Sequence, residues 1–460
     1  MIETKHIEEI KKIVGENDVK TDKVHLRAYS YDATKEHYYP DAVVFPENEE
    51  EVSKILKYCN DNKIAIVPRG AGSGFTGGAL PVNGGIVLAV EKYMNKILEI
   101  DEKDMVAVVQ PGVINAHLQK EVEKRGLFYP PDPASMDYST IGGNVSENAG
   151  GMRAAKYGIT KDYVMSLRAV LPNGDIIRAG KRTIKDVAGY NVAGILIGSE
   201  GTLAVITEIT LKLLPKPKMK KTYMGIFENV EDAMNAVYKS LSFGAMPVAM
   251  EFMDSLVVKA LRKKLGVNLP DWAGALLIGD VDGNVEEEIN YQLGILEKSF
   301  KENGCKEFKV ARDEKEANEI WFARRNASQS ITIYGSKKIN EDISVPRSKL
   351  PEALRVITQI GEKYGLVVPC FGHAGDGNIH VNVMVDGSNP QEVEKGYKAV
   401  EEIFKAVVEM GGTLSGEHGI GLSKAPFMKI AFSEAELNLF RRIKEAFDPN
   451  GILNPGKMGL

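Results

Sequence analysis

The segment FGHAGDGNIHVN, residues 371–382, places two of the chain's seven histidines on either side of one turn signal. Asp376 and Gly377 form the dipeptide that favours a type I′ turn between two apolar runs. A hairpin centred on this dipeptide pairs His373 directly with His380, with Cβ atoms roughly 5 Å apart. Both imidazoles would then reach one metal ion. The alternative is a pair of core histidines that hydrogen-bond locally.

Cysteine is excluded from this predicted metal site by the alternation of side chains along a strand. That alternation puts Asn382 on the same face as His380 and turns Cys370 to the other face. A third ligand must therefore come from elsewhere in the chain.

The segment SGEHGIG offers Glu417, followed by His418. Its glycines imply an irregular loop that can deliver both side chains to one site. Two histidines and one glutamate with an open coordination position form a catalytic metal set, which suits Zn, Fe or Mn.

A second candidate site is the loop GSGFTG, residues 72–77, which fits the dinucleotide-binding pattern G-x-G-x-x-G. A Rossmann loop must lead directly into a helix. Pro81 and the pair Gly84-Gly85 leave no room for a helix before the strand expected at Ile86. We therefore expect a different use for these glycines.

Glycine-rich loops occur three times in the first half of the chain, at 70–78, 142–151 and 198–201. A backbone with few side chains exposes successive N–H groups to an anion. Tight turns without a ligand are the alternative. Three such loops favour a long, phosphate-bearing cofactor that the backbone holds.

Short β-type runs dominate the region before the proline-rich segment PKPKMKK at 215–221, with one helix expected at 49–62. After it the pattern changes to strand–helix units. The strands expected in the first part are 43–45, 64–68, 86–90, 106–110, 164–171, 176–179 and 204–213. The units expected in the second part are 222–227, 230–243, 248–252, 275–280 and 285–303.

Composition excludes several classes of protein. The chain has 460 residues and is 43% hydrophobic, which is enough for two or three domains with full cores. Lys and Arg are scattered and the net charge is −5, so we expect no nucleic-acid surface. Three distant cysteines exclude a disulfide scaffold and an iron–sulfur cluster. No signal peptide or apolar run of about 20 residues is visible, so a cytoplasmic protein without a transmembrane segment is expected.

Four motifs together resemble the FAD-binding domain of the vanillyl-alcohol-oxidase (PCMH) type: PRGAGSGFTGG, PPDPAS, STIGGNVSENAGG and GSEGTLAVIT. With the second half, the chain resembles the family of glycolate oxidase flavin subunits, D-lactate dehydrogenases and D-2-hydroxyglutarate dehydrogenases. The resemblance implies an α+β fold. Its parts are a two-part FAD-binding domain at 1–215, an α+β ferredoxin-like cap domain with the metal hairpin at 222–410, and a short C-terminal helical segment at 411–460. This last segment is expected to complete the active site and to pack on the FAD domain.

The same resemblance assigns the cofactor contacts. Some relatives attach flavin covalently through a histidine in the first loop; Ser73 stands at that position here, which implies non-covalent FAD. The implied FAD-binding residues are Pro68, Arg69, Gly70, Gly72, Ser73, Gly74, Ser135, Thr140, Gly143, Asn148, Gly150, Glu200, Gly201 and Ile206.

For the catalytic site, the resemblance again implies His373, His380 and Glu417 as metal ligands. It adds His418 as general base and Asn382 as a substrate contact. Arg324, in WFARRNAS, matches an arginine that binds the substrate carboxylate, a role suited to its bidentate fork. The alternative for Arg324 is a solvated helix face.

Some 2-hydroxyglutarate relatives carry a lysine just before the segment that reads DISVP here, at 342–346. Lys337 and Lys338 are displaced from that position. The departure favours a small monocarboxylic hydroxy acid as substrate.

The implied activity is FAD-dependent, metal-assisted oxidation of a small D-2-hydroxy acid, such as D-lactate or glycolate, to the 2-oxo acid. Without a cysteine cluster, the chain must pass electrons to an electron-transfer flavoprotein, an iron–sulfur subunit or a quinone, and a membrane association would come only through such a partner. D-2-hydroxyglutarate oxidation is the alternative within the family. Three functions of other classes stay open: a metal-dependent hydrolase, an electron-transfer flavoprotein and an ether-lipid synthase. Self-association as a homo-oligomer also stays open.

Overall fold

The computed structural model describes residues 2–460, which divide into two compact units. Unit 1 extends to Gly150 and also contains Ile159–Lys216 and Glu417–Leu460. Unit 2 contains Gly151–Gly158 and Pro217–Gly416. Over residues 2–460, no helix is long and apolar enough to cross a membrane.

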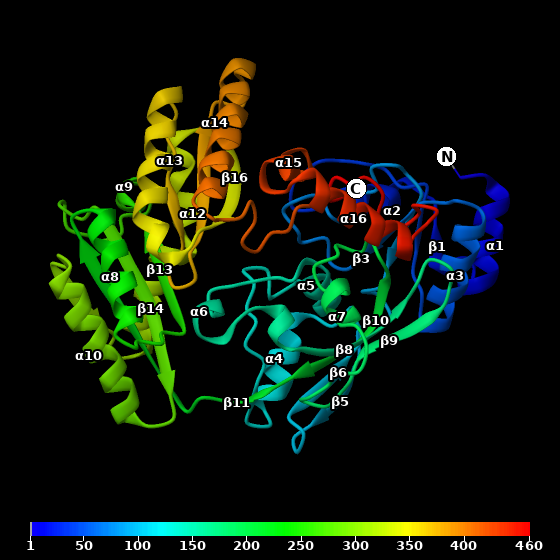
Figure 1. The fold of residues 1–460 in the computed structure, drawn as a ribbon, viewed down its shortest axis with the longest axis horizontal. Coiled ribbons are helices and arrows are strands. Elements are labelled where there is room, and N and C mark those ends of the chain that lie inside the picture. Colours follow the sequence, from blue (N-terminus) through cyan, green and yellow to red (C-terminus); the bar gives the residue numbers. More distant parts are fainter. Residues whose placement is uncertain (1) are drawn as a thin grey trace. The chain divides into compact units, whose positions relative to one another are not determined.

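Unit 1 begins with a four-stranded sheet in the order β1-β2-β4-β3. Figure 1 labels its strands β1 and β3. Its strands β2, β4 and β3 are parallel, and β1 pairs antiparallel at the edge. The helix α3 buries the face that the sequence pattern predicts, with Val52, Ile55, Leu56 and Cys59 in the core. The bounds are β1 Val19–Lys20, β2 Ala42–Val44, β3 Ile66–Arg69, β4 Ile86–Ala89, α1 Thr4–Val14, α2 Lys23–Ala28 and α3 Glu49–Asp61.

The second sheet of unit 1 is antiparallel and has the order β5-β6-β10-β8-β9. The seven strands expected from the sequence all form in these two sheets, whereas the edge strands β1 and β5 were not expected. The strands are β5 Ile97–Asp101, β6 Val106–Val109, β8 Val164–Val170, β9 Ile176–Gly180 and β10 Val205–Lys212, with a small pair β7 Leu127–Phe128 and β11 Leu214–Pro215. The helices are α4 Asn115–Glu123, α5 Ile141–Glu147, α7 Val192–Leu196, α15 Met428–Ala431 and α16 Glu434–Phe447.

The connection from β3 to β4 contains no helix between residues 70 and 85. The two strands are nevertheless parallel neighbours. A Rossmann unit would place a full helix between them. The prediction that GSGFTG does not open a dinucleotide-binding helix is therefore confirmed.

Unit 2 is built on one seven-stranded antiparallel sheet, in the order β15-β12-β14-β13-β17-β18-β16. The first four of these strands follow the order 4-1-3-2 that characterises a ferredoxin-like split βαβ arrangement. The strands are β12 Met219–Phe227, β13 Ala249–Met253, β14 Ala275–Gly283, β15 Glu307–Val310, β16 Lys337–Ser344, β17 Cys370–His373 and β18 Asn378–Val385.

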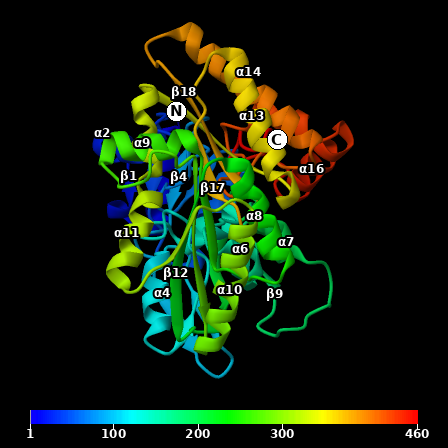
Figure 2. The same ribbon diagram turned by 90° about the vertical axis from the view of Figure 1, so that its left-hand side faces the viewer.

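Helices pack against this sheet, and Figure 2 shows α8 and α10 running along it beside β12. A second group, which includes α9 and α11, shares a buried apolar cluster with β13 and β17. Trp321 of α11 donates from Nε1 to Asp280 of β14 at 3.0 Å, which fixes α11 on this sheet. The helices are α6 Ala154–Tyr157, α8 Val230–Ser242, α9 Ser255–Leu265, α10 Glu286–Glu302, α11 Glu314–Arg325, α12 Ala327–Ser330, α13 Leu350–Tyr364 and α14 Pro390–Glu409.

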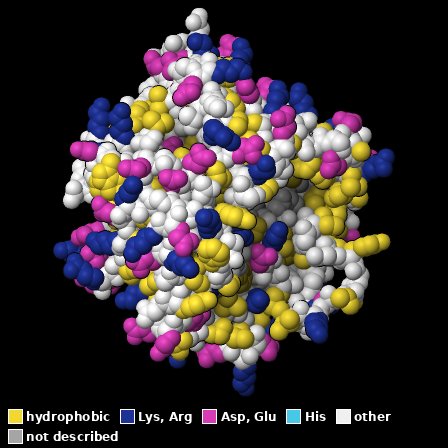
Figure 3. All heavy atoms as spheres, turned by 60° about the vertical axis from the view of Figure 1, so that its left-hand side comes forward, with side chains coloured by type: hydrophobic (Ala, Val, Ile, Leu, Met, Phe, Trp, Pro, Cys, Tyr) yellow, Lys and Arg dark blue, Asp and Glu magenta, His cyan; other side chains and the backbone are white. Residues whose placement is uncertain are grey.

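Basic and acidic side chains are interspersed over the face of the molecule drawn in Figure 3. Apolar side chains lie between them. The largest exposures belong to Ile184, Val187 and Tyr190, each at least 94% exposed, on the loop between β9 and α7. Figure 2 shows this loop standing away from the strands that precede it.

Candidate active site

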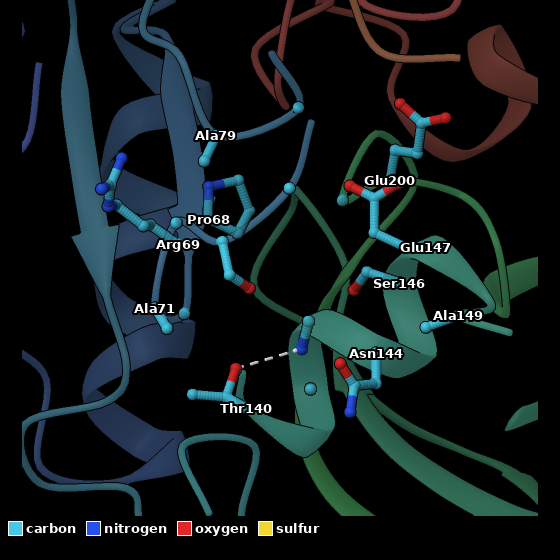
Figure 4. A pocket seen from close by; sticks show the side chains of 18 of the residues that line it. Pro68, Arg69, Ala71, Ala79, Thr140, Asn144, Ser146, Glu147, Ala149 and Glu200 are labelled. Carbon is cyan, nitrogen blue, oxygen red and sulfur yellow. Dashed lines mark hydrogen bonds between the residues drawn. The ribbon is translucent and has the colours of Figure 1, made fainter. Parts of the chain in front are cut away.

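A pocket in unit 1 is lined by the three glycine-rich segments (Figure 4). It is formed by the loop after β3, by residues 133–150, and by residues 200–206 at the start of β10. Of the residues predicted to bind the cofactor, every one except Asn148 lines it.

The loop after β3 packs closely against the start of α5. A Cβ atom on Gly70 would lie 2.1 Å from Thr140 Oγ1, so only glycine fits there. Thr140 is the N-cap of α5, and its Oγ1 accepts a hydrogen bond from Gly143 N at 3.3 Å, drawn dashed in Figure 4. Gly72 has φ +66°, a left-handed conformation that also favours glycine.

Asn148 does not line the pocket and instead caps the C-terminal end of α5. It ends α5 in the left-handed conformation, with φ 53° and ψ 48°. Its Oδ1 accepts a hydrogen bond from Lys161 N at 2.9 Å. A contact from Asn148 to a cofactor stays a prediction.

Arg69 braces the loop from behind. Its guanidinium points away from α5 in Figure 4, donates from Nη2 to the carbonyl oxygen of Tyr31 at 2.8 Å, and lies 5.3 Å from the ring centroid of Tyr29. Burial lowers the pKa of the guanidinium from its ordinary value.

Two buried carboxyl groups meet at one end of the pocket, and the sequence reasoning missed one of them, Glu147. Its side chain extends toward Glu200 in Figure 4. A Cβ on Gly419 would lie 2.2 Å from Glu147 Oε2 and 3.0 Å from Glu200 Oε1. Glu200 accepts hydrogen bonds from Ile420 N and Gly421 N, both at 2.7 Å.

Burial, reinforced by the neighbouring Glu200 carboxyl, raises the pKa of Glu147 well above its ordinary value. The protonated form is therefore favoured. Glu147 Oε2 is buried and has no hydrogen-bond partner among residues 2–460. An unpartnered buried polar atom indicates a ligand with polar groups, and the side-chain-free loops give that ligand backbone N–H groups. The pocket thus fits FAD.

Glu417 and His418 also line this pocket. The His418 ring lies 5.4 Å from the ring of Phe75, and its backbone oxygen accepts a hydrogen bond from Thr76 Oγ1 at 3.1 Å. A Cβ on Gly150 would lie 3.0 Å from Glu417 Cβ. The predicted base and one predicted metal ligand are therefore held at the cofactor pocket of unit 1.

The histidine hairpin forms in unit 2, but its predicted register is wrong. His380 lies opposite Phe371, two residues from the expected partner. His373 is therefore a diagonal neighbour of His380. A shift of two residues keeps each side chain on its face, and the two imidazole rings meet edge to face with centroids 5.1 Å apart.

The turn explains the difference. A type I′ turn needs positive φ at both central residues, but Gly377 has φ +94° and Asp376 is not in the left-handed region. The carbonyl oxygen of His373 accepts hydrogen bonds from both Asp376 N, at 3.2 Å, and Gly377 N, at 3.1 Å. The turn thus extends over residues 374–377.

A buried carboxylate joins the predicted metal ligand to the predicted substrate arginine. Glu251 of β13 pairs with His373 across the sheet, and its Oε1 lies 2.6 Å from His373 Nδ1. Its Oε2 accepts a hydrogen bond from Arg324 Nε at 2.6 Å. Arg324 is only 13% exposed, which argues against a solvated helix face.

The amide of Asn382 is engaged within the protein. Its Nδ2 donates to the carbonyl oxygens of Pro369 and His380, at 3.1 and 3.0 Å, and its Oδ1 accepts from Asn340 Nδ2 at 2.9 Å. Both N–H groups of Asn382 Nδ2 are therefore already donated within the protein, and a substrate contact of Asn382 stays a prediction.

Lys338 lies on the same sheet face as His380 and Asn382, because β16 pairs Asn340 with Asn382 and Asp342 with His380. Its Nζ donates to Ser328 Oγ at 2.7 Å, and burial lowers its pKa. The sequence alone gave no sign that this displaced lysine returns to the histidine face.

Comparisons with known proteins define the class. Residues 216–458 match the family described as FAD linked oxidases, C-terminal domain, and residues 40–180 match the FAD binding domain. The chain belongs to the family of FAD-linked oxidases and is an FAD-linked oxidoreductase.

Relatives are similar over nearly their whole length. The chain is 43% identical to the glycolate oxidase subunit GlcD of Bacillus subtilis (strain 168), covering 94% of this chain and 91% of that one. It is 37% identical to a D-lactate dehydrogenase of Anaerostipes hadrus, with 91% and 89% covered. It is 34% identical to a D-2-hydroxyglutarate dehydrogenase of Stutzerimonas stutzeri (strain A1501), with 98% of each covered.

Solved structures share the fold. A p-cresol methylhydroxylase with substrate bound matches with a TM-score of 0.82 at 20% identity, covering 99% of this chain and 96% of that one. An alkyldihydroxyacetonephosphate synthase matches with a TM-score of 0.75 at 21% identity, covering 99% and 86%. The α+β fold of the PCMH type expected from the sequence is confirmed.

Proposed function

We propose that the protein oxidises a small D-2-hydroxy acid, such as D-lactate or glycolate, to the 2-oxo acid with FAD and a divalent metal. The observation that carries this proposal is the pair His373 and His380 on one buried sheet face, where Glu251 links His373 to Arg324 of helix α11. A hydroxy acid requires a group that binds its carboxylate and a group that activates its hydroxyl. Arg324 would bind the carboxylate, and a metal held by the two histidines would activate the hydroxyl.

Glu417 is proposed as the third metal ligand. Chain connectivity supports the assignment, because Gly416 N donates to the carbonyl oxygen of Asp342 at 3.3 Å, and Asp342 is the cross-strand neighbour of His380. Glu417 follows Gly416 directly, and adjacent Cα atoms are about 3.8 Å apart. Imidazole and carboxylate ligands suit Zn, Fe or Mn.

The bound metal would polarise the substrate hydroxyl and lower its pKa. FAD, when bound, would supply the acceptor for the hydride, one hydrogen with two electrons, that leaves the substrate Cα. His418 would accept the hydroxyl proton on an imidazole nitrogen as general base. Arg324 would hold the carboxylate through its Nη fork, since Nε is already used for Glu251.

Electrons must then leave through a separate acceptor. Cys59, Cys305 and Cys370 are all free thiols that are remote in sequence, and none of them forms a cluster motif. An electron-transfer flavoprotein, an iron–sulfur subunit or a quinone would serve, and only a soluble dye is needed in the assay.

The test removes the base and the metal separately. His418→Ala should lose turnover with D-lactate or glycolate while it retains its FAD absorption. Removal of divalent metal with a chelator should abolish turnover, and added Zn²⁺ or Mn²⁺ should restore it. Full activity in His418→Ala would exclude the proposed base, and full activity of the metal-free protein would exclude the metal.

D-2-hydroxyglutarate oxidation is a second candidate, which the position of Lys338 favours. A cation on the histidine face could bind the second carboxylate of a dicarboxylic substrate. Lys338→Met should then lower kcat/KM for D-2-hydroxyglutarate and leave that for D-lactate unchanged. Equal effects on both substrates would remove this candidate.

A further inference from the structure

Glu251 lies at the centre of a closed group of side chains in unit 2. Its carboxylate is fully buried and bonds His373 Nδ1 and Arg324 Nε, each at 2.6 Å. The centroid of the Phe371 ring lies 4.9 Å from the guanidinium carbon of Arg324 and 5.4 Å from the centroid of the His380 ring. One carboxylate and one aromatic ring thus connect both histidines to the arginine.

We propose that Glu251 is a positioning residue that couples metal affinity to the placement of the substrate-binding arginine. The inference rests on the proposed function, in which His373 is a metal ligand and Arg324 binds the substrate. Glu251 would touch neither metal nor substrate. It would act through the two groups that do.

The chemistry of each contact supports this role. A carboxylate that accepts the Nδ1 proton of His373 fixes the tautomer that presents the Nε2 lone pair to a metal, and it increases the basicity of the ring. The second oxygen holds Arg324 by a charge-assisted bond, so the guanidinium keeps one orientation over Phe371.

The geometry requires two acceptor atoms on one residue. A glutamine at position 251 has one oxygen, and its NH₂ group would face either His373 Nδ1–H or Arg324 Nε–H. Glu251→Gln can therefore satisfy only one partner. Loss of Arg324 would also remove one of the two contacts that orient the carboxylate, and His373 would be affected at a distance.

Metal affinity provides a readout that does not depend on turnover. Full-length protein with FAD bound is stripped of metal, and Zn²⁺ binding is measured by competition with a chromophoric chelator. Glu251→Gln should bind Zn²⁺ about 10–100-fold more weakly than the wild type. Arg324→Met should also weaken Zn²⁺ binding, although Arg324 is not a ligand, and the double variant should bind no more weakly than Glu251→Gln alone.

Glu316→Gln is the matched control. Glu316 also accepts from an arginine, Arg312 Nη2 at 3.0 Å, and lies within 2.8 Å of Lys309 Nζ, but it contacts no histidine in these pairs. It should bind Zn²⁺ like the wild type. Glu251→Asp keeps two acceptor oxygens, so it should bind Zn²⁺ more tightly than Glu251→Gln. The visible absorption spectrum of its Co²⁺-loaded form should also resemble that of the wild type more closely than the spectrum of Glu251→Gln does.

Wild-type Zn²⁺ affinity in both Glu251→Gln and Arg324→Met would overturn the coupling. If Glu251→Gln does not fold, as judged by circular dichroism and size-exclusion chromatography, Arg324→Met alone decides. A protein that binds Zn²⁺ in this Glu251-dependent way but oxidises no hydroxy acid would retain the coupling and refute the proposed reaction.

Discussion

Gly70 gives the sharpest steric test of the FAD pocket. In Gly70→Ala the new Cβ would lie 2.1 Å from Thr140 Oγ1, well inside van der Waals contact, but 3.3 Å from Thr140 Cβ. Overpacking of this kind costs about 1–3 kcal/mol. If the free protein relaxes by moving the loop, restoring the loop for FAD takes that energy from binding. Because 1.4 kcal/mol is tenfold in affinity, FAD should bind about 5- to 150-fold more weakly.

The second substitution identifies the atom responsible. Thr140→Ala removes Oγ1, at the loss of an N-cap contact worth about 1 kcal/mol. Gly70→Ala with Thr140→Ala should therefore bind FAD more tightly than the sum of the single effects predicts, with a coupling of about 1–2 kcal/mol. Thr140→Val keeps a branched side chain of the same shape, so in the Gly70→Ala background it should not restore FAD affinity. Fluorescence titration of the apoprotein with FAD measures all four variants, and strictly additive effects, or equal rescue by valine, would refute the steric reasoning.

Three further predictions concern the cofactor, the metal and stability. Because Ser73 replaces an attachment histidine, acid or heat denaturation should release all FAD into the supernatant; flavin that remains with the precipitate contradicts this. His380→Ala should lose bound metal, whereas His117→Ala, at a side chain 56% exposed, should keep it, and equal metal content in both would exclude His380 as a ligand. Burial raises the pKa of Asp254 from 3.8 to about 7. Below pH 3.8 both the folded and the unfolded states hold this proton, whereas between pH 3.8 and 7 only the folded state does. The free energy of unfolding should therefore fall by about 1.4 kcal/mol for each unit that the pH rises within this window. Urea unfolding should show this slope flattened in Asp254→Asn, and parallel profiles would contradict the assignment.

Much of the fold follows from local sequence signals. The apolar stripe of α3 and the short β runs before residue 215 are confirmed, because each pattern reports burial of one face or of a whole strand. Pro81 and Gly84-Gly85 were sufficient to exclude a helix, since both residue types disfavour it for reasons of the backbone alone.

The site could be predicted only where the relevant geometry is local. The face shared by His373 and His380 depends on alternation within one hairpin, and it survived a wrong register. Glu251 could not be found in this way, because its contact with His373 depends on pairing between strands 122 positions apart in the chain. Glu147 was missed because its pKa is raised by burial and by the neighbouring Glu200, which no local sequence pattern reports.

The central claim is tested most directly by the flavin itself. The purified protein, with FAD and metal bound, is titrated anaerobically with D-lactate and with glycolate while the visible absorption of the flavin is recorded. The proposal predicts that at least one of these acids bleaches the oxidised flavin bands in proportion to the substrate added, and that His418→Ala prevents rapid bleaching. Flavin that stays oxidised with D-lactate, glycolate and D-2-hydroxyglutarate would contradict the proposal.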